Sequence, residues 1–459
     1  MYSQKVRKEK TEEEVLTLSD KYEPLFEWLD CPKFLDEKKT IPNPLYHVNT
    51  VVITGGRYSQ KSFGIGTFSG IAAKDYEHRI LYTRYTLTSA KDSIIPEFEE
   101  KLGLLNCADE FRVTKDSIKG VYNKSKIVFK GIKTGSGNQT ASLKSLKNFS
   151  IFILDEAEEM PDFTTWDKIK KSMRALDVRN LSILSLNPAT EEHWIHEELF
   201  EGKGVESGFN GIVGNVLYIH STYRDIEREF ISDDTWQEYE ELRLIYEAWK
   251  EASPKEKDAM DPKLIKKAKY FLHTILGGWL SKAEGVIFED WETGEFRDNG
   301  KAIFGQDYGF SVDPTTLIKV CIEKSLKKIY LKEYLYKPKM KTSEIYEFNK
   351  LIAGETLIVG DSAEPRLIEE LQEKGNNIIP AEKGPGSVSG GIARMLDYTL
   401  VVDPDSKNLK KELNNYVWHD KKSSTPIDDW NHLIDPIRYV VLELTEAPNN
   451  NLSKIAGMI

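Results

Sequence analysis

The chain has 459 residues, of which 40% are hydrophobic and 30% charged, and its formal net charge at pH 7 is −11. This length allows roughly two or three domains, and the acidic balance argues against a protein that coats nucleic acid over its whole surface. No apolar run approaches the roughly eighteen residues of a membrane span, and no secretory signal is visible at the charged N-terminus. The cysteines are too widely spaced for a zinc site, so we expect a cytosolic protein with no membrane contact.

The N-terminal half has the pattern of an α/β domain. Residues 1–48 are charged and helix-favouring, and this stretch ends in prolines. From Val51 onward, short apolar runs alternate with helix-favouring segments, as in a layered α/β structure. The strands expected there cover residues 51–54, 80–83, 127–129, 151–154 and 181–186.

The first of these strands leads into a candidate phosphate-binding loop. A glycine pair follows the strand, and Lys61 and Ser62 come at the spacing at which such loops bind the outer phosphates and Mg²⁺. Gln60 stands where the usual pattern has a glycine that lets the backbone approach the phosphates. The simpler alternative is a glycine-rich turn that only resembles a nucleotide site. The residues predicted to contact nucleotide are Gly55, Gly56, Arg57, Gln60, Lys61, Ser62 and Asp155.

Two later strand ends carry side chains suited to hydrolysis. The apolar strand 151–154 delivers Asp155, which suits Mg²⁺, and Glu156, which can orient and deprotonate a water. This pair favours a site that hydrolyses a nucleoside triphosphate over the bare turn. The strand 181–186 brings Ser185 and Asn187 to its end. These two residues either sense the γ-phosphate or precede an ordinary proline turn, and both interpretations stay open.

A lysine-rich segment lies between these motifs. Asp116 is the only acidic residue between Thr114 and Ser150, whereas the same stretch holds eight lysines. Lysines give sequence-independent affinity for a phosphate backbone. The alternative is a solvated lysine face, which is the usual meaning of a charge run. If the segment binds DNA, we expect Lys144 and Lys147 to contact it.

The second half of the chain changes from helices to strands. Residues 225–275 are highly charged and helix-favouring, which predicts a helical connector. Beyond Gly277, strands are expected at 302–307, 317–322, 329–331 and 356–361. The tail beyond residue 447 is rich in asparagine and is expected to be frayed.

Aspartates follow two of these strands. Asp307 and Asp361 each end a strand, and Asp435 begins an apolar helical pattern three residues after His432. Carboxylates at such positions can converge on two divalent ions about 3.5–4 Å apart, which activate water in phosphodiester cleavage. Mg²⁺ and Mn²⁺ prefer such oxygen ligands. His432 is either an accessory group at this site or a structural hydrogen-bonding residue.

Taken together, these motifs resemble those of the large terminase subunit of tailed bacteriophages, the family that packages DNA into capsids. The resemblance extends from about residue 48 to residue 445. In the first half it rests on Gly55–Ser62, Asp155 with Glu156, and the segments 143–146, 184–188 and 220–225. In the second half it rests on the segments 305–309, 360–365, 383–388 and 432–439.

The resemblance implies an α/β protein with two catalytic domains. The first is a P-loop ATPase domain of the ASCE type with a mostly parallel sheet, and the second is a ribonuclease H-like nuclease domain with a mixed sheet. The implied parts are a helical lead-in at 1–48, the ATPase domain at 49–228, a helical connector at 229–298, the nuclease domain at 299–447 and a flexible tail at 448–459.

The resemblance also implies roles for the residues named above. In the ATPase domain these are Mg²⁺ ligation by Ser62 and Asp155, base catalysis by Glu156, coupling by Ser185 and Asn187, and an arginine finger from Arg57 or Arg84. In the nuclease domain they are metal ligation and catalysis by Asp307, Asp361 and Asp435, with His432 as a possible accessory group, and DNA contact by Lys383.

The implied protein is an ATP-driven translocase of double-stranded DNA that also cuts concatemeric DNA in the host cytoplasm. ATP is its substrate and Mg²⁺ its cofactor, with Mn²⁺ able to support the nuclease. Its expected partners are double-stranded DNA, a portal protein on the procapsid, a small terminase subunit and further copies of itself in a ring. Two alternatives stay open: another nucleic-acid ATPase, of helicase or repair type, that does not cut, and a nucleotide-binding scaffold whose loop is impaired by Gln60.

Overall fold

The computed structural model describes residues 17–31, 43–86, 94–132, 148–176, 178–283, 285–309, 313–384, 386–419 and 422–445. The chain forms two compact units, Met1–Leu280 and Ser281–Ile459, which we call the N-terminal unit and the C-terminal unit. The segment 229–298, expected as a connector, is therefore divided between the two units. Within the described residues, no helix is both long enough and apolar enough to cross a membrane.

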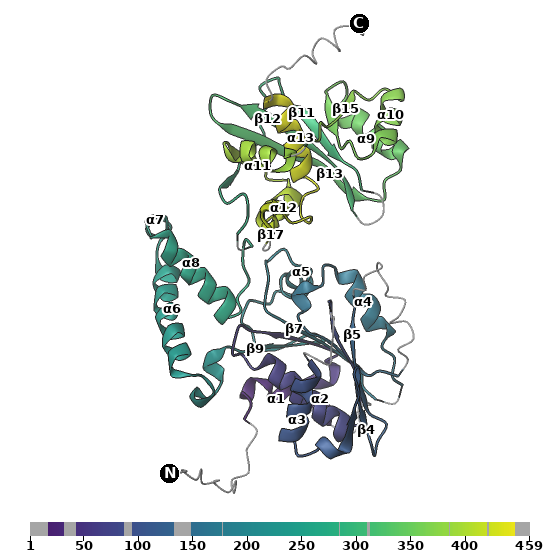
Figure 1. Ribbon diagram of the computed structural model, residues 1–459, viewed down its shortest axis with the longest axis vertical. Coiled ribbons are helices and arrows are strands. Elements are labelled where there is room, and N and C mark those ends of the chain that lie inside the picture. The colour runs from purple at the N-terminus through teal and green to yellow at the C-terminus, as the bar shows by residue number, and fades with distance from the viewer. Residues whose placement is uncertain are drawn as a thin grey trace, which may run out of the picture. The chain divides into compact units, whose positions relative to one another are not determined.

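A nine-stranded sheet forms the centre of the N-terminal unit (Figure 1). Its six central strands run parallel, and the strands at both edges pair antiparallel. Every residue of the central strands β1, β6 and β7 is buried, as expected for parallel strands covered on both faces. In sheet order the strands are β3 (Phe111–Val113), β4 (Ser117–Gly120), β5 (Lys126–Gly131), β2 (Arg79–Arg84), β6 (Ile151–Leu154), β7 (Leu181–Leu186), β1 (Thr50–Thr54), β9 (Val216–His220) and β8 (Gly211–Val213).

Helices cover both faces of this sheet. Because successive strand residues point to opposite faces, Ile80 and Tyr82 join one core and Leu81 joins the other. The first core packs against α1 (Glu23–Asp30), α2 (Lys61–Lys74) and α3 (Ile94–Leu104). The second packs against α4 (Phe163–Ser172) and α5 (Trp194–Leu199). The carboxyl ends of the parallel strands meet at one edge, which is where α/β sheets usually bind ligands.

A helical segment follows β9 within the same unit. It packs around an aromatic cluster that includes Tyr223, Tyr239 and Phe271. Its helices are α6 (Asp233–Glu251), α7 (Pro254–Asp258) and α8 (Pro262–Tyr270), and α8 continues into a π-helical turn, Phe271–Ile275. The short 3-10 turns of the unit are η1 (Asp20–Tyr22), η2 (Pro44–His47), η3 (Ala108–Glu110), η5 (Ala157–Glu159), η6 (Glu201–Lys203), η7 (Tyr223–Asp225) and η8 (Arg228–Phe230).

The C-terminal unit contains a seven-stranded mixed sheet. β12 pairs antiparallel with both of its neighbours, and the remaining pairs are parallel. In sheet order the strands are β10 (Trp291–Thr293), β16 (Thr399–Val402), β13 (Lys328–Pro338), β12 (Pro314–Glu323), β11 (Ile303–Asp307), β14 (Ile358–Gly360) and β15 (Ile378–Pro380). A separate pair is formed by β17 (Trp418–His419) and β18 (Lys422–Pro426).

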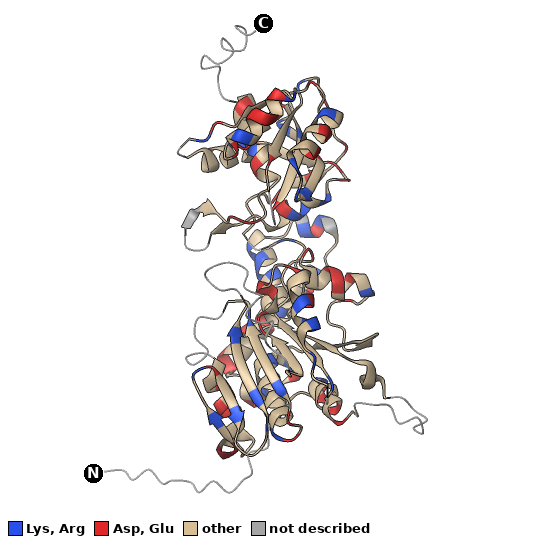
Figure 2. Cartoon of the chain, turned by 90° about the vertical axis from the view of Figure 1, so that its right-hand side faces the viewer, with Lys and Arg blue, Asp and Glu red and all other residues tan. Residues whose placement is uncertain are grey.

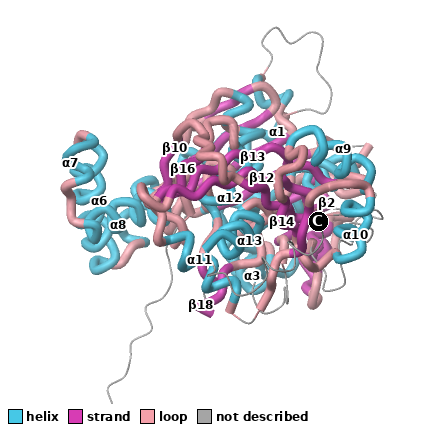
Figure 3. Tube along the Cα trace, turned by 90° about the horizontal axis from the view of Figure 1, so that it is seen from above, coloured by secondary structure: helices cyan, strands magenta, loops and turns pink. Residues whose placement is uncertain are grey.

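Helices also cover both faces of the mixed sheet (Figure 3). One face packs against α11 (Ser387–Leu396), α12 (Lys407–Asn415) and α13 (Ile434–Thr445). The other packs against α9 (Thr342–Ile352) and α10 (Pro365–Glu373). The prediction of an α/β protein with a mostly parallel sheet followed by a mixed sheet is confirmed.

Candidate active sites

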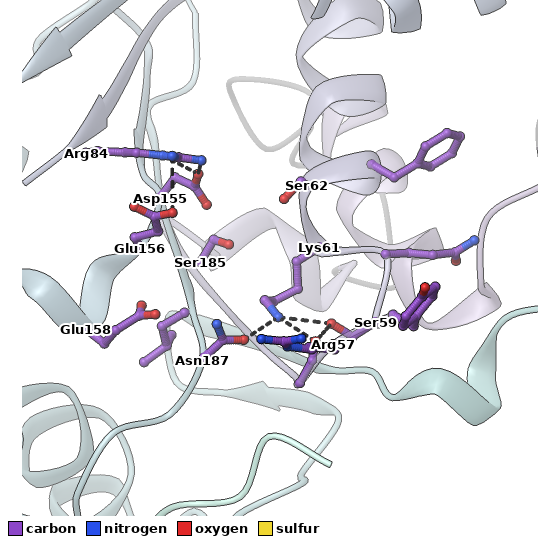
Figure 4. A pocket seen from close by; sticks show the side chains of 15 residues that line it. Arg57, Ser59, Lys61, Ser62, Arg84, Asp155, Glu156, Glu158, Ser185 and Asn187 are labelled. Atoms are coloured by element: carbon purple, nitrogen blue, oxygen red, sulfur yellow. Dashed lines mark hydrogen bonds and ion pairs between the residues drawn. The ribbon is translucent and has the colours of Figure 1, made fainter. Parts of the chain in front are cut away.

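The loop between β1 and α2 forms one wall of a polar pocket of about 350 Å³ (Figure 4). α2 begins at Lys61, so its unpaired N–H groups and the positive end of its dipole lie at the mouth of this loop. The structure thus brings most of the predicted nucleotide-site residues together. Those that line the pocket are Gly56, Arg57, Gln60, Lys61, Ser62, Arg84, Asp155, Glu156, Ser185 and Asn187.

Close backbone contacts explain the glycine pair of the loop. A Cβ on Gly55 would lie 2.2 Å from the Ser221 carbonyl oxygen, and one on Gly56 would lie 2.3 Å from that of Ile275. Gly277 is packed against the same loop, with the Gly55 backbone carbon 2.4 Å from its hypothetical Cβ. Only glycine fits at such distances, so the loop is shaped by the strand end and the π-helical turn that surround it.

Lys61 connects the loop to the end of β7. Its Nζ donates to the carbonyl oxygens of Gly55 at 2.5 Å and Gly56 at 3.0 Å, and to the Ser59 hydroxyl at 3.0 Å. It also donates to Asn187 Oδ1 at 2.9 Å. Burial lowers the pKa of Lys61 to about 8, although the nearby carboxylates of Glu158 and Asp155 oppose this shift. The ammonium group is therefore held in the pocket by polar oxygens.

Arg84 contacts both predicted hydrolytic carboxylates. It lies at the end of β2, which is adjacent and parallel to β6, so it reaches Asp155 Oδ2 through Nη2 at 2.8 Å and Nε at 3.0 Å. Its Nη1 lies 3.1 Å from Glu156 Oε1 (Figure 4). Burial raises the pKa of Glu156, and Arg84 opposes the shift. Of the two candidate fingers, Arg84 is thus tied to the carboxylates, whereas Arg57 lines the pocket from the loop.

Glu158 is a pocket residue that sequence reasoning missed. It lies on η5, directly after the Asp155–Glu156 pair, and it lines the same pocket (Figure 4). Burial raises the pKa of this carboxyl to about 7. Its position in an acidic run was visible in the sequence, but the direction of its side chain depends on the turn that follows β6.

The C-terminal unit brings its predicted aspartates to one end of the sheet. β11 and β14 are parallel neighbours, so Asp307 and Asp361 follow adjacent strand ends, and the Asp361 N–H donates to the Gln306 carbonyl at 3.0 Å. Asp435 comes from the first turn of α13, which packs on β11. Burial raises the pKa of Tyr439, and the charges of Asp435, Asp361 and Asp307 raise it further. All three predicted carboxylates therefore interact electrostatically with the Tyr439 hydroxyl.

Each of these aspartates contacts a cationic or ionisable partner. Asp361 pairs with Lys383, which was predicted only as a DNA contact. Arg438 reaches Asp435 Oδ1 through Nη2 at 3.0 Å and Nε at 3.2 Å. His432 Nδ1 lies 3.4 Å from Asp307 Oδ2.

Two of these contacts are reflected in pKa shifts. Burial raises the pKa of Asp435 despite the opposing Arg438 charge, and Asp307 adds to the shift. Burial disfavours protonation of His432, but its contacts with Asp307 and Glu412 outweigh this and raise its pKa. Burial thus sets the direction of the pKa shift of Asp435, whereas the neighbouring negative charges set that of His432.

The donor chemistry of this cluster fits a divalent cation. Carboxylate oxygens are the ligands that Mg²⁺ and Mn²⁺ prefer. The charge of Asp307 helps to raise the pKa of Asp435, so these two carboxylates interact electrostatically. As the side chains stand, no three His, Cys, Asp or Glu residues of the described chain are grouped tightly enough to hold one ion. The aspartates instead face protein cations, which a metal would have to replace. Lys144 and Lys147, the other predicted DNA contacts, lie outside the described residues.

A nucleotide-type pocket in one unit and a strand-end carboxylate cluster in the other define a two-site α/β protein. A sequence model described as phage terminase large subunit matches residues 47–250, and one described as terminase RNAseH like domain matches residues 307–443. The chain belongs to the phage terminase large subunit family, with a terminase ATPase domain and a ribonuclease H-like domain. The predicted resemblance is confirmed.

Relatives match along most of the chain. The terminase large subunit of Bacillus phage SPP1 is 27% identical over 436 residues, which cover 89% of this chain and 94% of the relative. The PBSX phage terminase large subunit of Bacillus subtilis (strain 168) is 22% identical over 407 residues, covering 84% and 87%.

Solved structures of large terminases are also similar to this chain. The large terminase of the HK97 bacteriophage has a TM-score of 0.44 at 10% identity and covers 92% of this chain and 99% of its own. The nuclease domain of the bacteriophage SPP1 large terminase, solved with bound Mn, has a TM-score of 0.31 at 29% identity. It covers 35% of this chain and 99% of its own.

Proposed function

We propose that this chain is the motor and the nuclease of a machine that packages double-stranded DNA into a phage capsid. The N-terminal unit hydrolyses ATP to move DNA, and the C-terminal unit cuts concatemeric DNA with two divalent metal ions. The observation that carries this proposal is one terminase-family chain with a pocket containing Lys61 and Glu156 and a separate unit whose predicted aspartates lie at two adjacent strand ends and at the start of α13.

In the nucleotide pocket, Lys61 exchanges its carbonyl and amide partners for phosphate oxygens of ATP. Ser62 and Asp155 hold Mg²⁺, which when bound neutralises the charge that develops on the phosphates. Glu156 orients the attacking water and accepts its proton, and its raised pKa makes it a stronger base. Arg84 contacts Oε1 of this carboxylate, so Oε2 is the oxygen that accepts the proton.

Coupling to movement starts at the end of β7. Asn187 is a hydrogen-bond partner of Lys61, so a change of partner at the ammonium group is felt directly at this strand end. Ser185 lies in β7, two residues before Asn187, and lines the same pocket. Of the two candidate arginines, Arg57, on the loop, is the one left to act on the transferred phosphate, because Arg84 is tied to Asp155.

In the nuclease unit, Asp307, Asp361 and Asp435 hold the divalent ions. When bound, such a pair activates water and stabilises the leaving oxygen of the phosphodiester. Lys383 and Arg438 balance the charges of Asp361 and Asp435, and a divalent ion held by these carboxylates would free Lys383 to contact a DNA phosphate. His432 keeps Asp307 oriented through its ring nitrogen.

A row of cations on the N-terminal sheet supports DNA contact. Arg112 pairs with Lys119, Lys119 with Lys126 and Lys126 with Arg79 across four adjacent strands, so the four side chains lie on one face of the sheet. Figure 2 shows Lys and Arg positions, in blue, on neighbouring strands of this sheet. Strands are about 4.8 Å apart, and like charges directly opposite each other are destabilising. Within the described residues none of the four forms an ion pair. A phosphate backbone supplies the missing negative charge.

The remaining partners follow from the family rather than from a site. As a packaging terminase the chain would work in the host cytoplasm, in a ring of its own copies on the portal of a procapsid. A small terminase subunit would deliver the DNA. The test of this part is whether the full chain packages DNA into procapsids that carry their portal.

ATP turnover, with and without double-stranded DNA, tests the motor. We expect DNA to stimulate turnover and Glu156→Gln to lower it by about 10²–10⁴-fold, the usual contribution of a general base. Absence of turnover in the folded wild-type chain would instead support a nucleotide-binding scaffold with a loop impaired by Gln60.

Plasmid cleavage in Mg²⁺ or Mn²⁺ tests the nuclease. Asp361→Ala should abolish cutting, whereas Asp397→Ala, at an exposed position of the same unit, should leave it unchanged. Equal cutting by both variants would remove Asp361 from the site. No cutting by the wild type, with DNA-stimulated ATP turnover intact, would favour a helicase-like or repair-like ATPase.

A further inference from the structure

Gln60 takes up the backbone conformation of the glycine that it replaces. Its φ is +57° and its ψ is +16°, in the left-handed backbone region that residues other than glycine rarely adopt. The same residue precedes α2, and its carbonyl accepts the Gly64 N–H at 2.7 Å. The chain therefore needs a compensating contact to hold a glutamine at this point.

The Gln60 side chain makes that contact with the N-terminal segment, which we define as residues 17–22. Its Oε1 accepts the Ser19 N–H at 3.0 Å, and its Nε2 lies 3.4 Å from the Thr17 carbonyl oxygen. A side-chain amide can accept and donate at once, so it pairs with the backbone much as another strand would. Glycine at position 60 offers neither bond.

Tyr22 provides a second attachment of the same segment. Its side chain is fully buried, and its hydroxyl donates to the carbonyl oxygen of Ser59, the loop residue before Gln60, at 2.8 Å. The ring packs on α2 at Gly64, where an added Cβ would lie 2.9 Å from two ring carbons. Both attachments meet consecutive residues of the phosphate-binding loop, although they come from different residues of the segment.

The segment also contacts the turn that follows β9. Lys21 Nζ lies 2.9 Å from Asp225 Oδ2, and that carboxylate caps the turn after β9 by accepting the Thr222 N–H at 2.7 Å. β9 is the parallel neighbour of β1, the strand that leads into the loop. The segment thus bridges two strand ends.

We propose that the N-terminal segment is a working part of the nucleotide site and that Gln60 is the positioning residue through which it sets the shape of the phosphate-binding loop. This inference rests on the proposed ATPase function for its effect on nucleotide, but the docking of the segment is independent of that function. It assigns Gln60 a purpose that a loop with the usual glycine lacks. Without the segment, the loop would lose its hold on the left-handed turn at Gln60.

The test compares Gln60→Gly, which restores the usual loop residue, with Tyr22→Phe and the wild-type full chain. The control is Lys327→Gly, because Lys327 also has a positive φ, +50°, but lies exposed in the turn between β12 and β13. Hydrogen exchange of residues 17–22 reports docking. Calorimetric titration with ADP and Mg²⁺ measures nucleotide affinity, which depends on the shape of the loop, without requiring ATP turnover.

We expect faster exchange of the segment in Gln60→Gly and Tyr22→Phe, and ADP binding weakened about fivefold, the factor equivalent to one net hydrogen bond. Lys327→Gly should change neither. Unchanged exchange in Gln60→Gly would overturn the docking role, and ADP binding equal to or tighter than wild type would overturn the positioning role. If wild-type protein does not bind ADP at all, the proposed ATPase function fails, and the exchange measurement still decides the docking.

Discussion

Glu412, a buried residue outside the predicted motifs, supports the strand-end carboxylate cluster of the C-terminal unit. Glu412 is fully buried on α12, and its Oε2 accepts the N–H groups of Leu433 at 2.8 Å and Ile434 at 3.1 Å. These groups directly precede Asp435, at the start of α13, where free N–H groups would otherwise be unpaired. A carboxylate is suited to this place because it also interacts well with the positive end of a helix. Glu412 therefore fixes the backbone that presents Asp435.

We expect Glu412→Ala to destabilise the C-terminal unit by about 3 kcal/mol, because two buried N–H groups lose their acceptor. Metal-dependent plasmid cutting should fall with it. Glu412→Gln, which keeps an acceptor oxygen, should retain most of both. Denaturant unfolding and plasmid cleavage are the measurements, with the exposed Glu373→Ala as control. Equal stability of the Ala and Gln variants would contradict this role.

At the scale of elements, α11 and α13 pack closely enough to need a glycine. A Cβ on Gly391 would lie 2.3 Å from Arg438 Cγ and 2.8 Å from its Cδ. Arg438 is only 3% exposed and holds Asp435, so the notch at Gly391 makes room for the side chain that orients a predicted metal ligand. The neighbouring Gly390 has no described atom within 4 Å of its hypothetical Cβ.

This pair of glycines gives a matched test. Gly390→Ala should stabilise the C-terminal unit by about 0.5–1 kcal/mol, because alanine is the better helix former and no contact is strained. Gly391→Ala should destabilise it by about 1–3 kcal/mol, because Arg438 must move. Cleavage by Gly391→Ala should fall as Asp435 loses its partner. Thermal unfolding of both variants decides the matter, and equal shifts would refute the packing argument.

The edge of the N-terminal sheet yields a second prediction at this scale. Lys119→Gln removes one of the two inner members of the cation row, so double-stranded DNA binding should weaken and the slope of log affinity against log salt should fall by about 1. Stability should stay the same or rise slightly, because Lys119 faces Arg112 and Lys126 directly. The control is Lys324→Gln, an exposed lysine in a turn of the other unit. An unchanged salt slope would argue for a merely solvated lysine face.

At the scale of the whole molecule, histidines buried in a neutral form make the N-terminal unit sensitive to acid. Burial lowers the pKa of His78, His193 and His220 to about 4 in each case. His193 shows the structural reason, since its Nε2 lies 3.1 Å from the Met160 carbonyl oxygen while its Nδ1 accepts the Ile195 N–H at 3.3 Å. A doubly protonated ring cannot accept that bond.

The sign of the pH effect follows from these shifts. Between about pH 6.5 and pH 4 the unfolded chain binds more protons than the folded chain, so the free energy of unfolding falls as the pH falls. Each histidine contributes on the order of 3 kcal/mol when the range is fully crossed. We expect denaturant midpoints of the N-terminal unit to drop through this range and His78→Gln to flatten the curve. A midpoint independent of pH would contradict the buried neutral state.

Much of the architecture follows from patterns that are local in the chain. Each apolar run is closely followed in the chain by the residue that marks its end, Gly55, Asp155, Asp307 or Asp361, so strand, loop and strand-end carboxylate are all visible in the sequence. Parallel strands then place those ends at one edge of a sheet. The fold class and the family were predictable for this reason.

The partnerships between side chains were not predictable in the same way. Ser19 meets Gln60 across 41 residues of sequence, and His432 meets Asp307 across 125. Arg84 was one of two candidates for an arginine finger, and its contact with Asp155 arises because β2 lies beside β6. Such contacts depend on strand order and on which helix face turns inward. These are settled by the packing of the whole core, and no short stretch of sequence carries that information.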